Sequence, residues 1–132
     1  TVNWFENSSI LKIIKLAAEQ GFKLVITTDH GMVYVKKPSQ VVGDRETSTN
    51  IRYKTGKSLT YDEKDVWAIT NPEKLFLPKG NLSSKYIFAK NNIFLAYPKN
   101  YNHFVNYYKD TYQHGGISLE EIIIPISILE PK

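Results

Sequence analysis

Apolar positions along the first part of the chain change from helical to strand spacing. After a capping serine, Ser8 or Ser9, apolar residues recur at positions 10, 13, 14 and 17, and Gly21 ends the segment, so a helix is expected. Residues 23–28 are short, apolar and rich in β-branched side chains, which is typical of a strand covered on both faces. Because a helix followed directly by a strand is the unit of a parallel sheet, the pattern predicts an α/β fold.

The middle of the chain is more polar and predicts shorter elements. Residues 62–69 are expected to form a short helix. Two apolar runs, 86–90 and 93–97, flank the dipeptide Asn91-Asn92. Since asparagine tolerates positive φ, these runs predict a β-hairpin.

The last part of the chain combines a helix, a loop and a strand. Residues 102–112 are expected to be helical, and Ser118 with Glu121 has the spacing of a capping box for a second short helix. The apolar segment 122–129 predicts a strand. Pro125 removes one backbone donor from that segment, which favours an edge strand or a bulge.

Two polar patches carry residues suited to metal binding. Asp29 and His30 follow the first predicted strand and precede Gly31. Ligands of open α/β sheets bind at the carboxyl ends of strands, and a break at Gly31 lets both side chains face one ion. His114 precedes two glycines, where the backbone can approach an ion or substrate closely. The alternative is that both patches are ordinary turns, since aspartate and glycine are common turn residues.

Composition narrows the class of protein further. The chain has 132 residues, a formal net charge of +4 and no cysteine, so any bound metal ion must be held by nitrogen and oxygen. It has neither an apolar run long enough to cross a bilayer nor the start of a signal peptide, and we expect no membrane insertion and a cytoplasmic location. The positive charge suits phosphate-rich partners, but lysine is spread along the chain, which favours an ordinary charged surface over a nucleic-acid groove.

Longer motifs in the chain resemble a known family. Thr-Thr-Asp-His-Gly at 27–31 and His-Gly-Gly-Ile-Ser-Leu-Glu-Glu at 114–121, followed by an apolar strand, resemble the PglZ domain of the alkaline phosphatase superfamily. Segments 42–45 and 50–53 and the tyrosine-rich segment around Tyr107 resemble the C-terminal half of PorX-type response regulators. Those regulators join a receiver domain, a helical linker and a PglZ domain, and are associated with control of type IX secretion.

This resemblance implies a fold and a domain organisation. Residues 1–132 would be the C-terminal portion of a single PglZ domain, that is, the C-terminal part of an alkaline-phosphatase-like three-layer α/β/α domain. Receiver and helical domains are expected upstream. The serine or threonine nucleophile and the remaining metal ligands are also expected upstream, so no catalytic residue is assigned within this chain.

The resemblance also implies a zinc-dependent chemistry. Two zinc ions bracket a phosphate in that superfamily, so Asp29 and His30 are expected to bind one ion and His114 the second. The parent protein would be a zinc-dependent phosphodiesterase of a two-component response regulator, acting on nucleotide or oligonucleotide phosphodiesters. This chain alone is expected to be inactive.

Two arginines between the metal motifs are candidates for binding the substrate phosphate. Arg45 and Arg52 lie in a polar stretch, and a guanidinium can hold a phosphate by two parallel hydrogen bonds. Structural pairing with Asp44 or Glu46 is an equally ordinary role. His103 lies among aromatic residues, where a packed histidine is more common than a metal ligand.

A function of another class stays open beside the enzyme. The chain would then be a non-catalytic regulatory module with structural zinc that binds a sensor kinase, a sigma factor or a protein of the secretion machinery. Asp29, His30 and His114 favour metal binding without deciding between the two functions. The oligomeric state of the parent is also left open.

Overall fold

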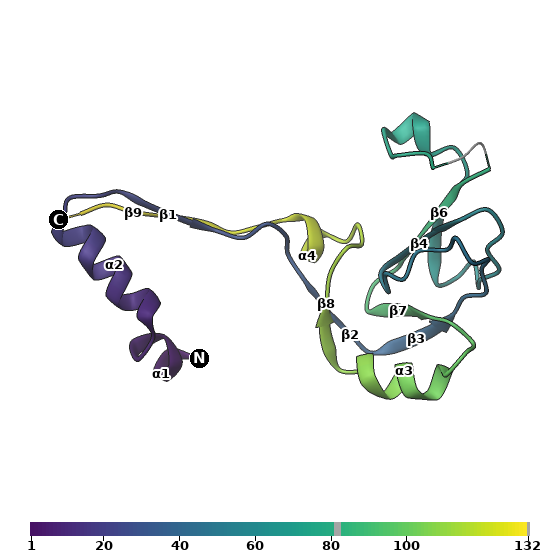
Figure 1. The fold of residues 1–132 in the computed structure, drawn as a ribbon, viewed down its shortest axis with the longest axis horizontal. Coiled ribbons are helices and arrows are strands. Elements are labelled where there is room, and N and C mark those ends of the chain that lie inside the picture. The colour runs from purple at the N-terminus through teal and green to yellow at the C-terminus, as the bar shows by residue number, and fades with distance from the viewer. Residues whose placement is uncertain (81–82, 132) are drawn as a thin grey trace. The chain divides into compact units, whose positions relative to one another are not determined.

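The structure is a computed structural model that describes residues 1–80 and 83–131. The chain forms two compact units, the first made of Thr1–Asp29 with the segment from Ile124 onward, and the second of His30–Ile123. The ribbon in Figure 1 shows helices and strands in both, so the mixed α/β class is confirmed. The three-layer arrangement and the place of this chain in a larger domain stay predictions.

The first unit contains two helices and a two-stranded antiparallel ribbon. The elements are α1 (Val2–Glu6), α2 (Ser9–Glu19), β1 (Leu24–Thr27) and β9 (Ile126–Leu129). Ser8 caps α2 by accepting a hydrogen bond from Leu11 N at 3.4 Å, and Gly21 follows the helix with a φ of 75°. Both predicted ends of this helix are therefore confirmed.

The strand predicted at 23–28 exists, but its surroundings differ from the prediction. β1 pairs antiparallel with β9, Leu24 opposite Leu129, rather than in a parallel sheet. Only Leu24 is half-buried, and the other three residues of β1 are exposed, so the expectation of cover on both faces is wrong for the described structure. Pro125 precedes β9 instead of interrupting it, and its carbonyl accepts from Thr27 Oγ1 at 2.9 Å.

The described residues of the second unit form seven strands in three small sheets, with one main helix. β2 (Val33–Val35) pairs antiparallel with β8 (Thr111–Gln113), and β3 (Lys37–Gln40) pairs parallel with β7 (Ile93–Ala96). β4 (Tyr53–Gly56), β6 (Lys85–Ala89) and β5 (Val66–Ile69) form an antiparallel sheet in that order. The helical elements are η1 (Pro72–Leu75), α3 (Tyr101–Tyr108) and α4 (Leu119–Ile122).

Three local predictions in this unit were wrong in part. Residues 62–69 form a turn and then β5, because Val66 is buried and pairs with Ala89. β6 and β7 are strands, and Asn91 has a φ of 44° between them, but they do not form a hairpin. β6 already has β4 on one edge and β5 on the other, so β7 pairs with β3.

The third difference concerns the helix expected at 102–112. α3 ends at Tyr108, and Asp110 takes a φ of 61°, which leaves the helical region of the backbone. The following residues pair as β8 with β2. This strand pairing shortens α3, and local sequence patterns do not predict it.

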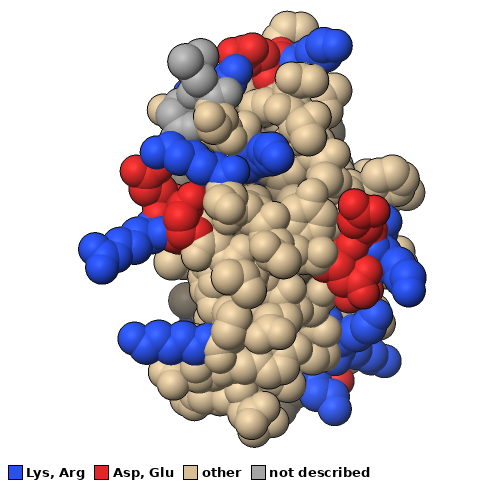
Figure 2. Space-filling model, turned by 90° about the vertical axis from the view of Figure 1, so that its right-hand side faces the viewer, with Lys and Arg blue, Asp and Glu red and all other residues tan. Residues whose placement is uncertain are grey.

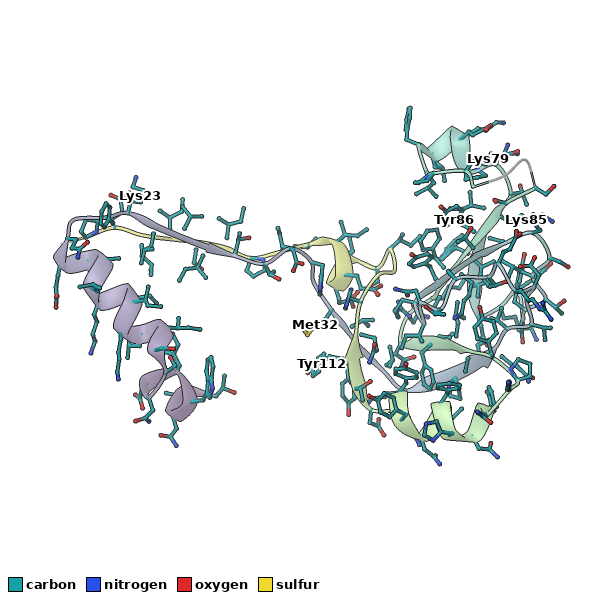
Figure 3. All side chains as sticks on the ribbon, viewed as in Figure 1. Lys23, Met32, Lys79, Lys85, Tyr86 and Tyr112 are labelled. Carbon is teal, nitrogen blue, oxygen red and sulfur yellow. The ribbon has the colours of Figure 1, made fainter. Side chains whose placement is uncertain are left out.

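Most of the buried hydrophobic side chains among the described residues of the second unit belong to two clusters. One contains Val41, Val66, Ile87, Ala89, Ile93 and Leu95, and the other Val33, Val35 and Phe94. Val105 and Tyr108 of α3 pack against the second cluster, so this helix covers part of it. Tyr86, labelled in Figure 3, donates to Pro78 O at 2.8 Å and holds the segment after η1 against β6.

The surface carries its charges in a scattered way. On the face shown in Figure 2, Lys and Arg side chains stand apart around an uncharged centre, with Asp and Glu between them. A continuous basic groove is not visible on this face. Among the described residues, no helix is long and apolar enough to cross a membrane.

Candidate functional site

The second unit brings two predicted metal ligands together. His30 lies just before β2 and His114 just after β8, and the antiparallel pairing sets Val33 opposite Gln113 (Figure 1). The pairing therefore places the residues that flank these strands side by side. The two imidazole rings stack with centroids 3.8 Å apart and planes inclined by 13°.

One backbone contact orients the ring of His30. Its Nδ1 lies 2.8 Å from the carbonyl oxygen of Gly31. A carbonyl only accepts hydrogen bonds, so Nδ1 carries the proton and the lone pair of the neutral ring is on Nε2. Metal-binding histidines commonly donate their other ring N–H to a carbonyl in this way.

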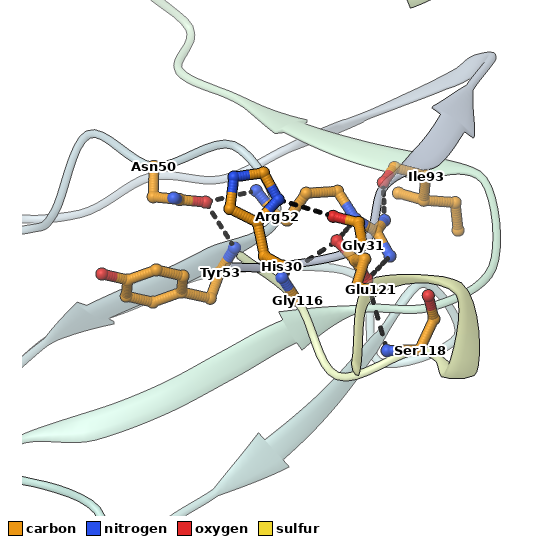
Figure 4. A network of polar contacts seen from close by, with 9 residues as sticks. All are labelled: His30, Gly31, Asn50, Arg52, Tyr53, Ile93, Gly116, Ser118 and Glu121. Atoms are coloured by element: carbon orange, nitrogen blue, oxygen red, sulfur yellow. Dashed lines mark hydrogen bonds and ion pairs between the residues drawn. The ribbon is translucent and has the colours of Figure 1, made fainter. Parts of the chain in front are cut away.

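Glu121 connects the two loops that carry these histidines (Figure 4). Its backbone carbonyl accepts from Gly31 N at 3.0 Å. Its carboxylate accepts from Gly116 N at 2.9 Å and from Ser118 N at 3.2 Å. The predicted capping box at the start of α4 is thus confirmed, and the same residue fixes the loop after His114 relative to the loop after His30.

A buried arginine holds this glutamate in place. Arg52 Nε donates to Glu121 Oε1 at 2.8 Å and Nη2 to Oε2 at 2.9 Å, and Nη1 donates to the carbonyl of Ile93. The side chains of Arg52 and Glu121 are 0% and 1% exposed. Burial acts to raise the pKa of Glu121, but the hydrogen bonds and charge of Arg52 and the N–H of Gly116 keep that pKa below its usual value.

Two glycines of the sequence motifs are explained by this packing. A Cβ on Gly31 would overlap the carbonyl of Glu120, and a Cβ on Gly116 would overlap the carboxylate of Glu121. The close approach that the glycines permit is therefore made by protein groups in the described structure.

The remaining predicted residues lie in different settings. Asp29 is exposed and follows β1, at the end of the first unit. Arg45 is exposed in the turn at 45–46. Among the described residues, neither of its alternative structural partners pairs with Arg45: Asp44 accepts from the backbone N–H groups of residues 46, 57 and 58, and Glu46 pairs with Lys57 at 2.8 Å.

Arg52 differs most from its predicted setting. All three kinds of guanidinium nitrogen donate to Glu121 or Ile93, so the structure favours a positioning role over the predicted substrate contact. Sequence reasoning identified Glu121 only as a helix cap. The pair joins residues far apart in the chain, and no local signal reveals it.

The donors present suit zinc in kind but not in number. Imidazole nitrogen and carboxylate oxygen are ordinary zinc ligands, and Asp29, His30 and His114 supply them. Within 1–80 and 83–131, no three His, Asp or Glu residues are grouped as a metal site. The described chain therefore offers part of a ligand set.

Comparison with known families decides the relationship. The family of the BREX system PglZ alkaline phosphatase-like domain matches residues 6–128. The chain belongs to the PglZ family. The match includes both histidine loops of this PglZ chain and relates the chain to alkaline phosphatase-like domains, that is, to a phosphoesterase-type fold. No curated protein matches the chain.

Proposed function

We propose that this PglZ chain is part of a zinc-dependent phosphodiesterase domain that acts on nucleotide or oligonucleotide phosphodiesters. The observation that carries the proposal is the stacked pair of His30 and His114 in a chain of the alkaline phosphatase-like family. These rings come from loops far apart in sequence, and Glu121 holds both loops.

The geometry of the pair favours two ions over one. The lone pairs of two nearly parallel rings lie in separate, nearly parallel planes, an arrangement that suits two neighbouring ions better than one shared ion. Ring centroids 3.8 Å apart bring the two imidazoles close enough to serve neighbouring ions, and the ions of catalytic two-metal sites lie about 3.5–4 Å apart. In keeping with the sequence motifs, we assign Asp29 and His30 to one zinc ion and His114 to the other.

The residues of this chain would bind the zinc ions and contact the phosphate, and none of them would act as the nucleophile. Zinc at such sites stabilises negative charge on phosphate oxygens. The contact with Gly31 O sets the tautomer and direction of the His30 ring. The exposed guanidinium of Arg45 would hold the phosphate through two hydrogen bonds. The nucleophile would come from an upstream part of the domain.

The wider context remains the one implied by the sequence motifs. The chain would be the C-terminal portion of the PglZ domain of a cytoplasmic, PorX-type response regulator linked to type IX secretion. Thr-Thr-Asp-His-Gly at 27–31 and the loop at 114–121 support this assignment.

A regulatory binding module is the second candidate, and one observation favours it. Apolar side chains of the first unit are exposed, among them Ile13, Leu16, Val25 and Ile126. Exposed apolar patches often mark protein contacts. In that case a kinase, sigma factor or secretion protein would be the partner and zinc would be structural.

Metal analysis and hydrolysis assays on the intact protein distinguish these functions. We expect zinc in the purified protein and hydrolysis of bis(p-nitrophenyl) phosphate. Each of His30→Ala and His114→Ala should abolish turnover, and the double variant should lose zinc. His103→Ala is the matched control, because His103 is exposed on α3 beside Phe104 and Tyr107.

The outcomes separate the parts of the proposal. Unchanged zinc content in the double variant would show that the ligand assignment is wrong. Zinc without turnover in the unmodified protein would favour the binding module. Residues 1–132 alone should bind zinc more weakly than the intact protein and show no turnover, because a partial ligand set leaves the ion largely to water.

Arg45 is tested by a substitution that keeps its charge. Arg45→Lys removes the planar fork of donors, so catalytic efficiency should fall while zinc content stays normal. Lys57→Arg, at the exposed ion pair with Glu46, is the control for a surface charge. Wild-type efficiency in Arg45→Lys would exclude Arg45 as a phosphate ligand.

A further inference from the structure

A small cavity lies between the end of β7 and α3 in the second unit. Its volume is about 250 Å³, and its walls are mostly apolar. Ile51 and Leu95 line it from the strand side, and Phe104 and Tyr108 line it from the helix. A cavity of this size accommodates a ligand smaller than most drug-like molecules.

A lysine without an acidic partner also lines this cavity. Lys54 in β4 is 1% exposed, and in the part of the chain that the structure describes it forms no ion pair. Its Nζ lies 4.2 Å from the ring centroid of Tyr97, another lining residue. Tyr97 Oη donates to Ser48 O at 2.7 Å, which fixes the ring.

The contrast with Arg52 shows why this lysine is unusual. Arg52 is equally buried, but Glu121 neutralises it. Buried charges in proteins are normally paired, and a cation–π contact offsets only part of the cost of removing an ammonium from water. Burial accordingly lowers the pKa of Lys54 to about 8, so most of the amine still carries its charge at neutral pH.

We propose that this cavity binds a small monocarboxylate with an apolar or aromatic body. One carboxylate oxygen would pair with Nζ of Lys54, and the body would lie against Ile51, Leu95 and Phe104. A single negative charge matches the single cation. A phosphate dianion suits the cavity less well, because its other oxygens would face apolar walls.

This site goes beyond the proposed phosphodiesterase. None of the residues predicted from the sequence to bind zinc or the phosphate (Asp29, His30, His114, Arg45 and Arg52) lines the cavity. Carboxylate binding at Lys54 can therefore be tested independently of phosphodiester hydrolysis.

Calorimetric titration of the intact protein with benzoate tests the proposal, with benzamide as a neutral ligand of the same shape. Benzoate should bind about ten- to a hundredfold more tightly than benzamide, the range for a charge-assisted hydrogen bond. Because a bound carboxylate raises the pKa of Lys54, binding at pH 8.5 should take up protons. Affinity should fall as the pH rises from 8 to 10.

Two variants place the bound benzoate in this cavity. Lys54→Met keeps the length of the side chain and should reduce affinity at least tenfold without lowering the melting temperature. Thr49→Glu changes an exposed lining residue, and its carboxylate should weaken benzoate binding by repulsion or by pairing with Lys54.

Several results would overturn the proposal. The first is the absence of benzoate binding at 10 mM ligand, which is on the order of the weakest specific affinities. The second is equal affinity for benzoate and benzamide, and the third is unchanged benzoate affinity in Lys54→Met. Binding that persists in Lys54→Met would place benzoate on surface lysines. Loss of binding in Lys54→Met together with Thr49→Glu, with normal circular dichroism in both, would support it.

Discussion

Replacing Glu121 by glutamine should destabilise the second unit strongly, because it removes a charge without changing the size of the side chain. The carboxylate accepts two hydrogen bonds from Arg52, one from Gly116 N and one from Ser118 N. An amide keeps one acceptor oxygen and presents its NH₂ to donors. The guanidinium of Arg52, 0% exposed, would then lack a counter-charge.

The magnitude follows from the burial of both partners. Removing one member of a buried ion pair typically costs about 3–5 kcal/mol. A domain is stable by only about 5–15 kcal/mol, and 1 kcal/mol corresponds to roughly 4 °C in melting temperature at this size. Glu121→Gln should therefore lower the melting temperature by about 12–20 °C.

Urea and thermal denaturation of the intact protein, followed by circular dichroism, measure this effect. Glu120→Gln is the matched control, because Glu120 is the exposed neighbour on the same helical turn, and it should change stability by less than about 0.5 kcal/mol. The double variant Arg52→Met with Glu121→Leu should lose less than the sum of its single variants, since it leaves no unpaired charge.

The site itself gives a second measurement of the same perturbation. The carboxylate of Glu121 holds the loop after His114, so Glu121→Gln should also weaken zinc binding about 10–100-fold, as loss of a supporting hydrogen bond does at metal sites. The backbone contact of residue 121 with the loop after His30 is kept in this variant. A loss of stability below about 1 kcal/mol, or strict additivity in the double variant, would refute the argument that this buried pair organises the site.

Three further predictions concern the pH dependence of the Glu121 contribution, the packing at Gly116 and the charge of Lys54. The pKa of Glu121 is held below its usual value, so its stabilising contribution is present above about pH 4.3 and is lost as the pH falls through the folded pKa. When the free energy of unfolding of wild type and of Glu121→Gln is measured at decreasing pH, the difference between the two proteins should shrink towards zero at low pH. Gly116→Ala, whose Cβ would overlap the Glu121 carboxylate, should cost about 1–3 kcal/mol in urea denaturation, whereas Gly80→Ala, which meets only an ordinary contact at 3.8 Å, should be nearly silent. Lys54→Met should stabilise the protein at pH 7 by at most about 3 kcal/mol, because folding lowers the pKa of Lys54 from 10.5 to about 8. Wild type should regain that difference between about pH 8 and 10.5 as the amine becomes neutral, and a constant difference across this range would contradict the assignment.

The amino-acid sequence by itself determined the local features of the chain. The cap at Ser8, the end of α2 at Gly21 and the capping box of Ser118 and Glu121 were all predicted and are all present. Each depends on residues within one or two turns of each other, so the chain carries the necessary information locally. The motif residues that resemble the PglZ family could be recognised in the sequence for the same reason, and the family match confirms that relationship.

Only the tertiary structure decided which distant segments meet. β6 and β7 are separated by a suitable turn, yet they take other partners because both edges of β6 are occupied. Arg52 was predicted as a candidate phosphate ligand in a polar stretch, and the tertiary structure places its side chain in the interior against Glu121. Lys54 carried no signal in the sequence, because a lysine becomes unusual only when packing removes it from water and, as here among the described residues, provides no carboxylate partner. Strand pairing and burial depend on the free energy of contacts between residues far apart in the chain, which local patterns do not encode.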